Sequence, residues 1–235
     1  MAHHFFRQSA SRPVPYGPMR HPPREVIRRH RHDEGFVALV LEGTYVESGD
    51  TGHHRVSAGD VIVHNPWESH VNAIGGRGAQ VLVLPFSNRW ELAARGTIAD
   101  PDRVARIAAR DGRAAIEEMA ETFTPVATEP ADWPDQLAAD LRRDPGLELG
   151  TWAEAKGLHP AGLARGFRAM FGVTPADYRL QQRAHRALAA ILHSPAELAH
   201  IAYEEGFADQ AHMTRAVRRV SGTTPASIRR MMIGR

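Results

Sequence analysis

The C-terminal part of the chain contains one pattern twice, and this duplication constrains the fold more than any other feature. Residues 157–175 read GLHPAGLARGFRAMFGVTP, and residues 206–225 read GFADQAHMTRAVRRVSGTTP. Arg165 and Arg168 in the first segment lie 50 positions before Arg215 and Arg218 in the second. Each copy predicts a helix, a glycine turn, a second helix and a Gly-x-Thr-Pro segment whose proline opens the next helix.

The second helix of each copy separates an apolar stripe from a basic face when residues are placed about 100° apart. The apolar stripes comprise Leu163, Gly166, Phe167 and Met170 in the first copy, and Met213, Ala216, Val217 and Val220 in the second. The opposite faces comprise Ala161, Gly162, Ala164, Arg165 and Arg168, and His212, Thr214, Arg215, Arg218 and Arg219. No acidic residue lies between Gln210 and Arg230. Because a merely solvated face mixes acids with bases, this pattern favours contact with a nucleic acid.

Basic residues are also in excess over the whole C-terminal part of the chain. Residues 136–235 carry 14 Lys and Arg against 9 Asp and Glu, whereas the first 135 residues carry 15 against 18. A polyanionic partner is therefore expected for the C-terminal half. The absence of cysteine excludes disulfides, thiolate catalysis and cysteine-based zinc sites. Without an apolar run of about 18 residues we expect no membrane span, and a cytoplasmic protein.

Patterning divides the chain into four parts. Residues 1–25 are rich in proline and arginine and predict a flexible arm. Residues 26–87 contain short apolar runs, such as FVALVLEG and AQVLVLPF, between turn signals, and predict an antiparallel β-barrel. Residues 88–136 predict a helical connector and a Pro-rich linker, and residues 137–235 predict an all-α domain. In the connector, five apolar residues recur at roughly helical spacing and predict the apolar stripe of a helix: Val104, Ile107, Ala108, Ile116 and Met119.

The segment IAYEEGFADQAHMTRAVRRVSGTTPASIRR (201–230) resembles the signature of the AraC/XylS family of bacterial transcription regulators. The resemblance covers about residues 138–232 and implies two helix-turn-helix units joined by a long helix over residues 175–194. It implies that the two recognition helices enter successive major-groove segments of double-stranded DNA. The residues that it places against DNA are Gln210, Ala211, His212, Thr214, Arg215, Arg218 and Arg219 in the second unit, and Ala161, Ala164, Arg165 and Arg168 in the first.

Roles differ within this set. Arg165 and Arg215 are expected to read bases, because arginine can donate two hydrogen bonds to guanine. Arg168, Arg218 and Arg219 are expected to contact phosphates. The first unit departs from the family pattern: Gly166 weakens its recognition helix by about 1 kcal/mol relative to alanine, and His159 replaces the usual Ser cap. We therefore predict that the second unit performs most of the direct base readout.

The N-terminal domain resembles a cupin, in which HRHDEGFVALVLEG (30–43) and GDVIVHNPWESHVN (59–72) form the two halves. The resemblance implies that His30, His32 and His70 match the histidines of a metal cupin. Glu34 comes earlier than the metal-cupin glutamate, although strand alternation still places positions 30, 32 and 34 on one face. Three imidazoles and a carboxylate could hold Zn, Fe, Mn or Ni.

Three alternatives stay open for this domain: a metal site, a metal-free pocket in which His30, His32, Glu34 and His70 bind an organic effector, or no small ligand. Trp67, Phe36 and Tyr45 could form pocket walls or simply pack in the core. His53, His54 and His64 follow no ligand spacing and are expected at the surface or in turns.

The favoured function is a sequence-specific transcription regulator, not an enzyme, whose cupin senses a small-molecule effector. The alternative is a metal-dependent cupin enzyme with an appended DNA-binding domain, and a third hypothesis is a non-specific DNA-binding protein. The duplicated motif favours the regulator, since a cupin enzyme does not need it. The family resemblance further implies a homodimer, formed in part by residues 88–128, and RNA polymerase as a partner.

Overall fold

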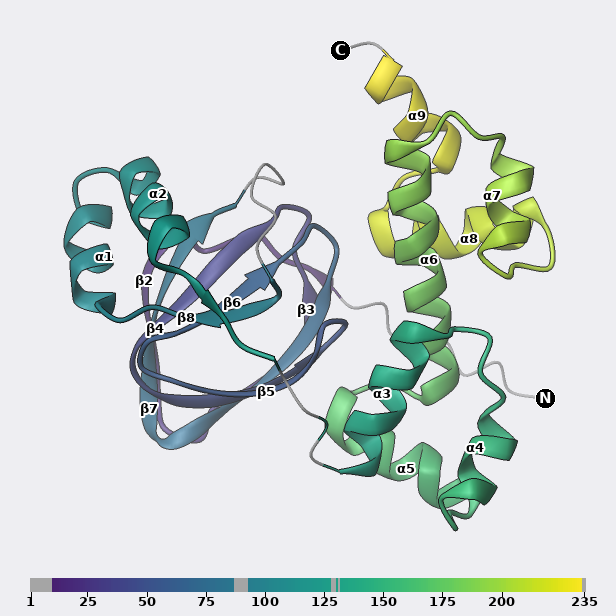
Figure 1. Cartoon of the computed structure of the whole chain (residues 1–235), viewed down its shortest axis with the longest axis horizontal. Helices are drawn as coiled ribbons and strands as arrows, with labels where there is room; N and C mark the ends of the chain where they lie inside the picture. Colours follow the sequence, from purple (N-terminus) through teal and green to yellow (C-terminus); the bar gives the residue numbers. More distant parts are fainter. Residues whose placement is uncertain (1–9, 87–92, 128–129, 131, 234–235) are drawn as a thin grey trace. The chain divides into compact units, whose positions relative to one another are not determined.

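A computed structural model of the chain describes residues 10–86, 93–127, 130 and 132–233. The chain forms two compact units, Met1–Glu129 and Pro130–Arg235, coloured along the sequence in Figure 1. The first is built on an antiparallel sheet and the second is helical, which confirms the predicted fold class. No helix among the described residues is long and apolar enough to cross a membrane.

Two long strands organise the sheet of the first unit (Figure 1). β4 pairs with β7 along its whole length, and its other edge pairs with β6 near its start and with β5 near its end. β7 also pairs with β2 and β3, so both long strands bend around an interior. Over the described residues the ladder runs from β1 to β9 without closing into a complete ring. The strands are β1 (Ala10–Ser11), β2 (Gly17–His21), β3 (Val26–Arg31), β4 (Phe36–Gly49), β5 (Gly52–Ser57), β6 (Asp60–His64), β7 (Ser69–Pro85), β8 (Arg95–Thr97) and β9 (Thr124–Pro125).

Both faces of the sheet are buried, which explains the nearly continuous apolar run FVALVL in β4. Val37 and Leu39 contribute to one core, whereas Phe36, Ala38 and Val40 contribute to the other. This division follows the alternation of side chains along a strand. The second face surrounds the interior in which the candidate ligand cavity lies.

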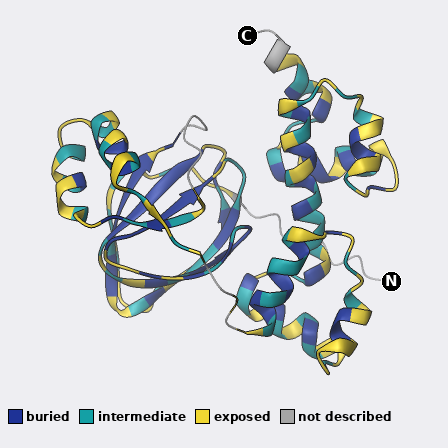
Figure 2. Cartoon of the chain, in the orientation of Figure 1, coloured by how far each residue is buried: buried dark blue, intermediate teal, exposed yellow. Residues whose placement is uncertain are grey.

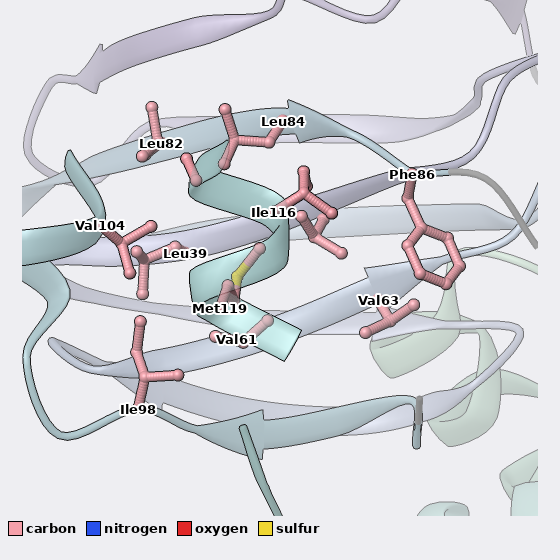
Figure 3. Close-up of a cluster of buried hydrophobic side chains, with 12 residues drawn as sticks. Leu39, Val61, Val63, Leu82, Leu84, Phe86, Ile98, Val104, Ile116 and Met119 are labelled. Atoms are coloured by element: carbon pink, nitrogen blue, oxygen red, sulfur yellow. The ribbon is translucent and has the colours of Figure 1, made fainter. Parts of the chain in front are cut away.

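Two helices, α1 (Pro101–Ala108) and α2 (Gly112–Thr122), cover the first face of the sheet. Val104, Ile116 and Met119 pack against strand residues such as Leu39 and Leu82 (Figure 3). The apolar stripe predicted for the connector is thus buried inside its own domain.

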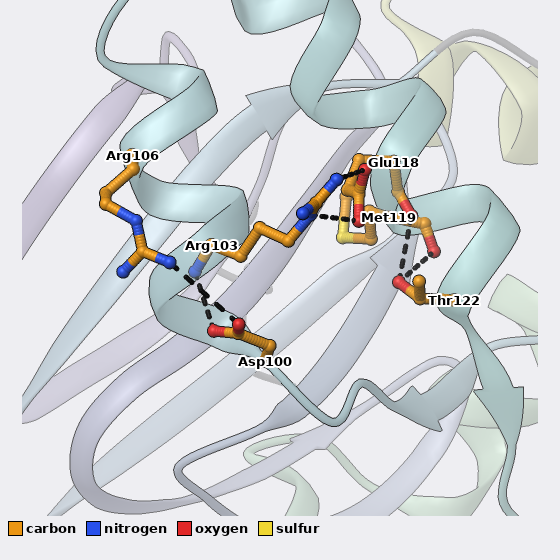
Figure 4. A network of polar contacts seen from close by, with 6 residues as sticks. All are labelled: Asp100, Arg103, Arg106, Glu118, Met119 and Thr122. Carbon is orange, nitrogen blue, oxygen red and sulfur yellow. Dashed lines mark hydrogen bonds and ion pairs between the residues drawn. The ribbon is translucent and has the colours of Figure 1, made fainter.

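Polar contacts hold the exposed side of the same helix pair (Figure 4). The Arg103 side chain donates to both carboxylate oxygens of Glu118, at 2.7 and 3.1 Å, and joins α1 to α2. Asp100 caps α1 by accepting from the backbone N–H of Arg103 at 2.8 Å, and it pairs with Arg106 at 3.9 Å. These contacts fix the hairpin on the sheet and leave a charged outer surface.

The predicted limits of the parts need two corrections. Part of the stretch expected as a flexible arm, Gly17–His21, is strand β2, and its backbone pairs with Ala79–Val83 of β7; residues 1–9 lie outside the described part. Proline is tolerated there because β2 occupies a sheet edge. The helical unit begins at Pro130 rather than at residue 137, because α3 (Trp133–Arg143) packs Leu137 and Leu141 into the helical core.

The helical unit repeats one motif. α4 (Leu149–Ala155) and α5 (Pro160–Phe171) form the first helix-turn-helix, and α7 (Leu198–Glu204) and α8 (Gln210–Ser221) form the second. α6 (Pro175–His193), about 28 Å long at 1.5 Å per residue, joins them, and α9 (Pro225–Ile233) ends the described chain. The turn glycines Gly157 and Gly206 have φ of 65° and 70°, a left-handed conformation that glycine adopts without strain. The structure confirms the predicted duplication.

Candidate DNA-binding surface and ligand cavity

The recognition helices α5 and α8 begin and end in the same way. In α8, Asp209 caps the N-terminus by accepting from the backbone N–H of His212 at 2.6 Å. In α5, the Nδ1 atom of His159 accepts from the N–H of Ala161 at 3.2 Å. His159 therefore performs the capping role for which the family pattern uses serine. Left-handed glycines, Gly172 and Gly222, terminate the two helices.

The apolar stripe of each recognition helix faces the core, as Figure 2 shows by the alternation of buried and exposed residues along α5 and α8. In α8 all four predicted stripe residues are buried: Met213, Ala216, Val217 and Val220. In α5, Leu163 and Phe167 are buried, together with Phe171, whereas Met170 is only half-buried. This burial fixes which side of each helix remains available to a partner.

That available side carries arginines. Arg165 and Arg168 of α5 and Arg215 and Arg218 of α8 are exposed, and within the described part of the chain their side chains form no hydrogen bond or ion pair. Arg219 is also exposed. Positive charge without acidic neighbours attracts a phosphate backbone and costs nothing in broken ion pairs when DNA binds.

The smaller residues of the predicted DNA face are less uniform. Gln210, Ala211 and Ala161 are exposed, whereas His212, Thr214 and Ala164 are half-buried. The His212 ring lies edge-on to Phe207, with 5.3 Å between ring centroids. His212 is thus held by a packing contact, so its imidazole is less mobile than that of a fully exposed histidine.

Gly166 in α5 is explained by packing. A Cβ atom at this position would lie 2.4 Å from the indole of Trp133, far inside van der Waals contact. The glycine that helix propensity alone reads as a defect therefore allows α3 to approach α5. Sequence reasoning missed this role because nothing local connects positions 133 and 166.

The first unit contains a cavity of about 640 Å³ on the inner side of the sheet. Its apolar walls include Phe36, Tyr45, Ile74, Val81 and Val83. Phe36 and Tyr45, but not Trp67, thus line the cavity. Its polar walls include four histidines and a glutamate: His30, His32, His64, His70 and Glu47.

The histidines are brought together by strand register. His30 on β3 lies directly across from His70 on β7, and their ring centroids are 4.4 Å apart. His32 follows β3, with its ring 5.0 Å from that of His30. His64 ends β6, and its ring lies 4.6 Å from that of His70. Glu47 on β4 completes the cluster, with Oε2 3.6 Å from Nε2 of His64. We refer to these five residues as the histidine cluster.

The histidine cluster is buried, and burial controls its protonation. Desolvation lowers the pKa of His30 to about 4 and that of His64 to about 3, and it lowers the pKa of His32 and His70 as well. Desolvation, together with the charge of Glu68, raises the pKa of Glu47 to about 8. Burial therefore favours the uncharged form of all five groups.

Two polar atoms of this cluster lack a partner. Nδ1 of His70 and Oε1 of Glu47 are buried and form no hydrogen bond with any residue that the structure describes. Glu47 is only 1 % exposed. Each unpartnered buried polar atom destabilises the folded state by about 1–3 kcal/mol. This cost is offset when the group binds a ligand.

Glu34, the carboxylate expected from the sequence, does not belong to this cluster. It is exposed and accepts a hydrogen bond from the Tyr16 hydroxyl at 2.8 Å. Burial, and secondly this contact, raise the pKa of Tyr16 to about 12. The strand ends near His32, so strict alternation no longer carries position 34 to the inner face.

Glu47 and His64 take its place, and sequence reasoning missed both. His64 and His54 were expected at the surface or in turns, but both are 3 % exposed. Alternation within β6 contains the missing signal: Ile62 faces the inner core, so His64, two residues later, faces it too. Likewise Tyr45 points inward and Glu47 follows it by two residues.

Family models match both units of the chain. A family model described as an AraC-like ligand binding domain matches residues 12–142, and one described as a helix-turn-helix domain matches residues 152–231. No curated protein sequence matches the chain.

The chain also matches several solved structures. Wild-type ToxT from Vibrio cholerae, with unsaturated fatty acid bound, is 10 % identical, covering 95 % of this chain and 99 % of its own, with a TM-score of 0.44. The DNA-binding domain of the transcription factor AdpA, in complex with a target DNA, is 20 % identical, covering 46 % of this chain and 96 % of its own, with a TM-score of 0.41. A probable AraC family regulator from Rhodopseudomonas palustris is 17 % identical, covering 41 % of this chain and 94 % of its own, with a TM-score of 0.39.

A sheet domain with an inner cavity, followed by two helix-turn-helix units, defines a ligand-binding transcription regulator. The matched models span more than half of the chain, and the chain belongs to the AraC/XylS family of DNA-binding transcription regulators.

Proposed function

We propose that the protein reads a specific DNA sequence through α5 and α8 and responds to a small molecule held in the cavity of its first domain. The observation that carries the first part is the equivalent placement of exposed arginines on both recognition helices: Arg165 and Arg168 on α5, and Arg215 and Arg218 on α8. Arg165 and Arg215 occupy equivalent positions for base contact, and Arg168 and Arg218 occupy equivalent positions for phosphate contact.

The cavity supports the second part of the proposal. Its volume of about 640 Å³ lies within the range of about 300–1,000 Å³ that is usual for small-molecule sites. Apolar walls with a few convergent polar groups are the general composition of such sites. The effector would contact His30, His32 and His70 but not Glu34, which lies outside the cavity lining.

The proposal also covers the localisation, oligomeric state and protein partner of the chain. We infer a cytoplasmic homodimer that has RNA polymerase as a partner, and family membership supports this inference. The apolar stripe of α1 and α2 is occupied by the sheet, so a dimer contact by these helices would use their charged outer side. Sedimentation of the full chain at micromolar concentration tests the dimer: a single monomeric species would contradict it.

Selection of DNA fragments from a random pool by the full-length chain tests sequence-specific binding. A selected fragment should bind at least about 1,000-fold more tightly than unrelated DNA at physiological salt. Equal binding to both DNAs at every salt concentration would reduce the protein to a non-specific DNA binder and contradict the proposal.

A further inference from the structure

The tautomers of two histidines in the cavity are fixed by the backbone. Nδ1 of His30 lies 2.9 Å from the carbonyl oxygen of Arg28, and Nδ1 of His32 lies 2.8 Å from that of Arg12. A carbonyl oxygen can only accept, so Nδ1 carries the proton in both rings and Nε2 keeps its lone pair. A histidine held in this way by its outer nitrogen is oriented as metal-binding histidines usually are.

The remaining cluster members supply further donors. Ligand atoms of His30, His32 and His70 all lie within 4.8 Å of one another, and the same holds for Glu47, His64 and His70. His70 belongs to both groups. Two of the buried polar atoms that have no hydrogen-bond partner among the described residues, Nδ1 of His70 and Oε1 of Glu47, belong to these groups. Their unmet bonding capacity is the second, independent sign of an absent ligand.

We propose that His30, His32 and His70, with His64 and Glu47 completing the shell, bind one divalent transition-metal ion. Neutral imidazole nitrogens with a single carboxylate suit Zn²⁺, Fe²⁺, Co²⁺ or Ni²⁺ better than Mg²⁺ or Ca²⁺, which prefer oxygen ligands.

The proposed ion would lie at the polar end of the cavity. Other cavity walls, including Ile74, Val81 and Val83, are apolar, so a ligand in the cavity would form its strong polar contacts at the histidine cluster. If the proposed effector function holds, the ligand of this domain is the metal ion or contains it. Metal binding itself requires neither DNA nor an effector and can be measured separately.

Titration of the full-length chain with Zn²⁺ and Co²⁺, after removal of metal with a chelator, tests the proposal. Calorimetry should give one high-affinity ion per chain, and Co²⁺ should produce visible absorption bands of a nitrogen-ligated ion. His70→Gln removes the donor shared by both groups and should weaken binding at least about 100-fold, since even indirect partners of a metal ligand are worth about 10–100-fold. His32→Gln should weaken it similarly and serves if His70→Gln does not fold.

Matched variants separate this site from other histidines and from the expected carboxylate. His21 lines the same cavity but belongs to neither group, so His21→Gln should bind the ion like the wild type. Glu34→Gln should also leave affinity unchanged, whereas Glu47→Gln should weaken it. Absence of stoichiometric Zn²⁺ and Co²⁺ binding by the wild type, or unchanged affinity in folded His32→Gln and His70→Gln, would overturn the proposal.

Discussion

Among single side chains, the contact between Trp133 and Gly166 shows how tertiary packing can reverse a local preference. Helix propensity favours alanine over glycine in the interior of a helix by about 1 kcal/mol. At position 166 the space that a methyl group needs is filled by the indole of Trp133. Trp133 is part of α3, so this contact ties the first helix of the unit to its first recognition helix.

Gly166→Ala should therefore lower the free energy of unfolding of the helical unit by about 1–3 kcal/mol, the usual cost of overpacking. The control is Gly162→Ala in the same helix, where an added Cβ meets no atom within 4 Å and should stabilise by up to about 1 kcal/mol. Urea unfolding followed by circular dichroism compares the two. A stabilising effect of Gly166→Ala would show that Trp133 moves aside freely.

Arg215 and Arg168 should differ in what they contribute to DNA binding. Arg215→Ala should weaken binding to a selected DNA site by about 1–3 kcal/mol and binding to random DNA much less. Arg168→Ala should weaken both and reduce the slope of log affinity against log salt by about one. Fluorescence anisotropy over a salt series measures both quantities.

Arg113→Ala is the control for this pair, because Arg113 is exposed on α2 in the other unit and pairs with Glu117. It should leave both DNA affinities unchanged. Equal losses on both DNAs for Arg215→Ala would instead assign Arg215 to phosphate contact.

N-terminal caps contribute to the stability of the two recognition helices, α5 and α8. The Asp209 carboxylate satisfies a backbone N–H at the start of α8 and adds a negative charge where the helix dipole favours one. His159 at the start of α5 offers a neutral acceptor at a longer distance. The second recognition helix is therefore the better capped of the two.

Asp209→Ala should lower the free energy of unfolding by about 0.5–2 kcal/mol, whereas Asp209→Asn, which keeps an acceptor, should cost a smaller part of this. His159→Ala should cost less than Asp209→Ala. Thermal unfolding of the full chain measures all three, and an Asp209→Ala variant as stable as the wild type would contradict the role of the cap.

The helical elements were predictable because their signals are local. Gly157 and Gly206 mark the turns, Asp209 marks a helix start, and the burial of Met213 and Val217 follows from periodicity. The histidine cluster was predictable only in part. His30, His32 and His70 follow a motif, but the choice of Glu47 and His64 over Glu34 depends on strand register, which couples residues far apart in sequence. Strand β2 was missed for the same reason, since its partner residues 79–83 lie far along the chain.

Considered as a whole, the molecule divides its two tasks between two separately packed units. The first surrounds its cavity with a sheet whose opposite face is sealed by α1 and α2. The second unit contains one motif twice, and α6 joins the two copies. Each recognition helix therefore carries two exposed arginines at equivalent positions. The excess of basic residues in 136–235 agrees with this arrangement, and no acidic residue lies between Gln210 and Arg230 in the sequence.

Hydroxyl-radical footprinting of the full-length chain on a selected DNA fragment measures whether α5 and α8 both bind one DNA duplex. We expect two protected segments on one side of the duplex, about 10–10.5 base pairs apart from centre to centre. Protection in the segment assigned to α5 should weaken with Arg165→Ala and in the other with Arg215→Ala. A single protected segment that responds to Arg215→Ala and not to Arg165→Ala would contradict this expectation.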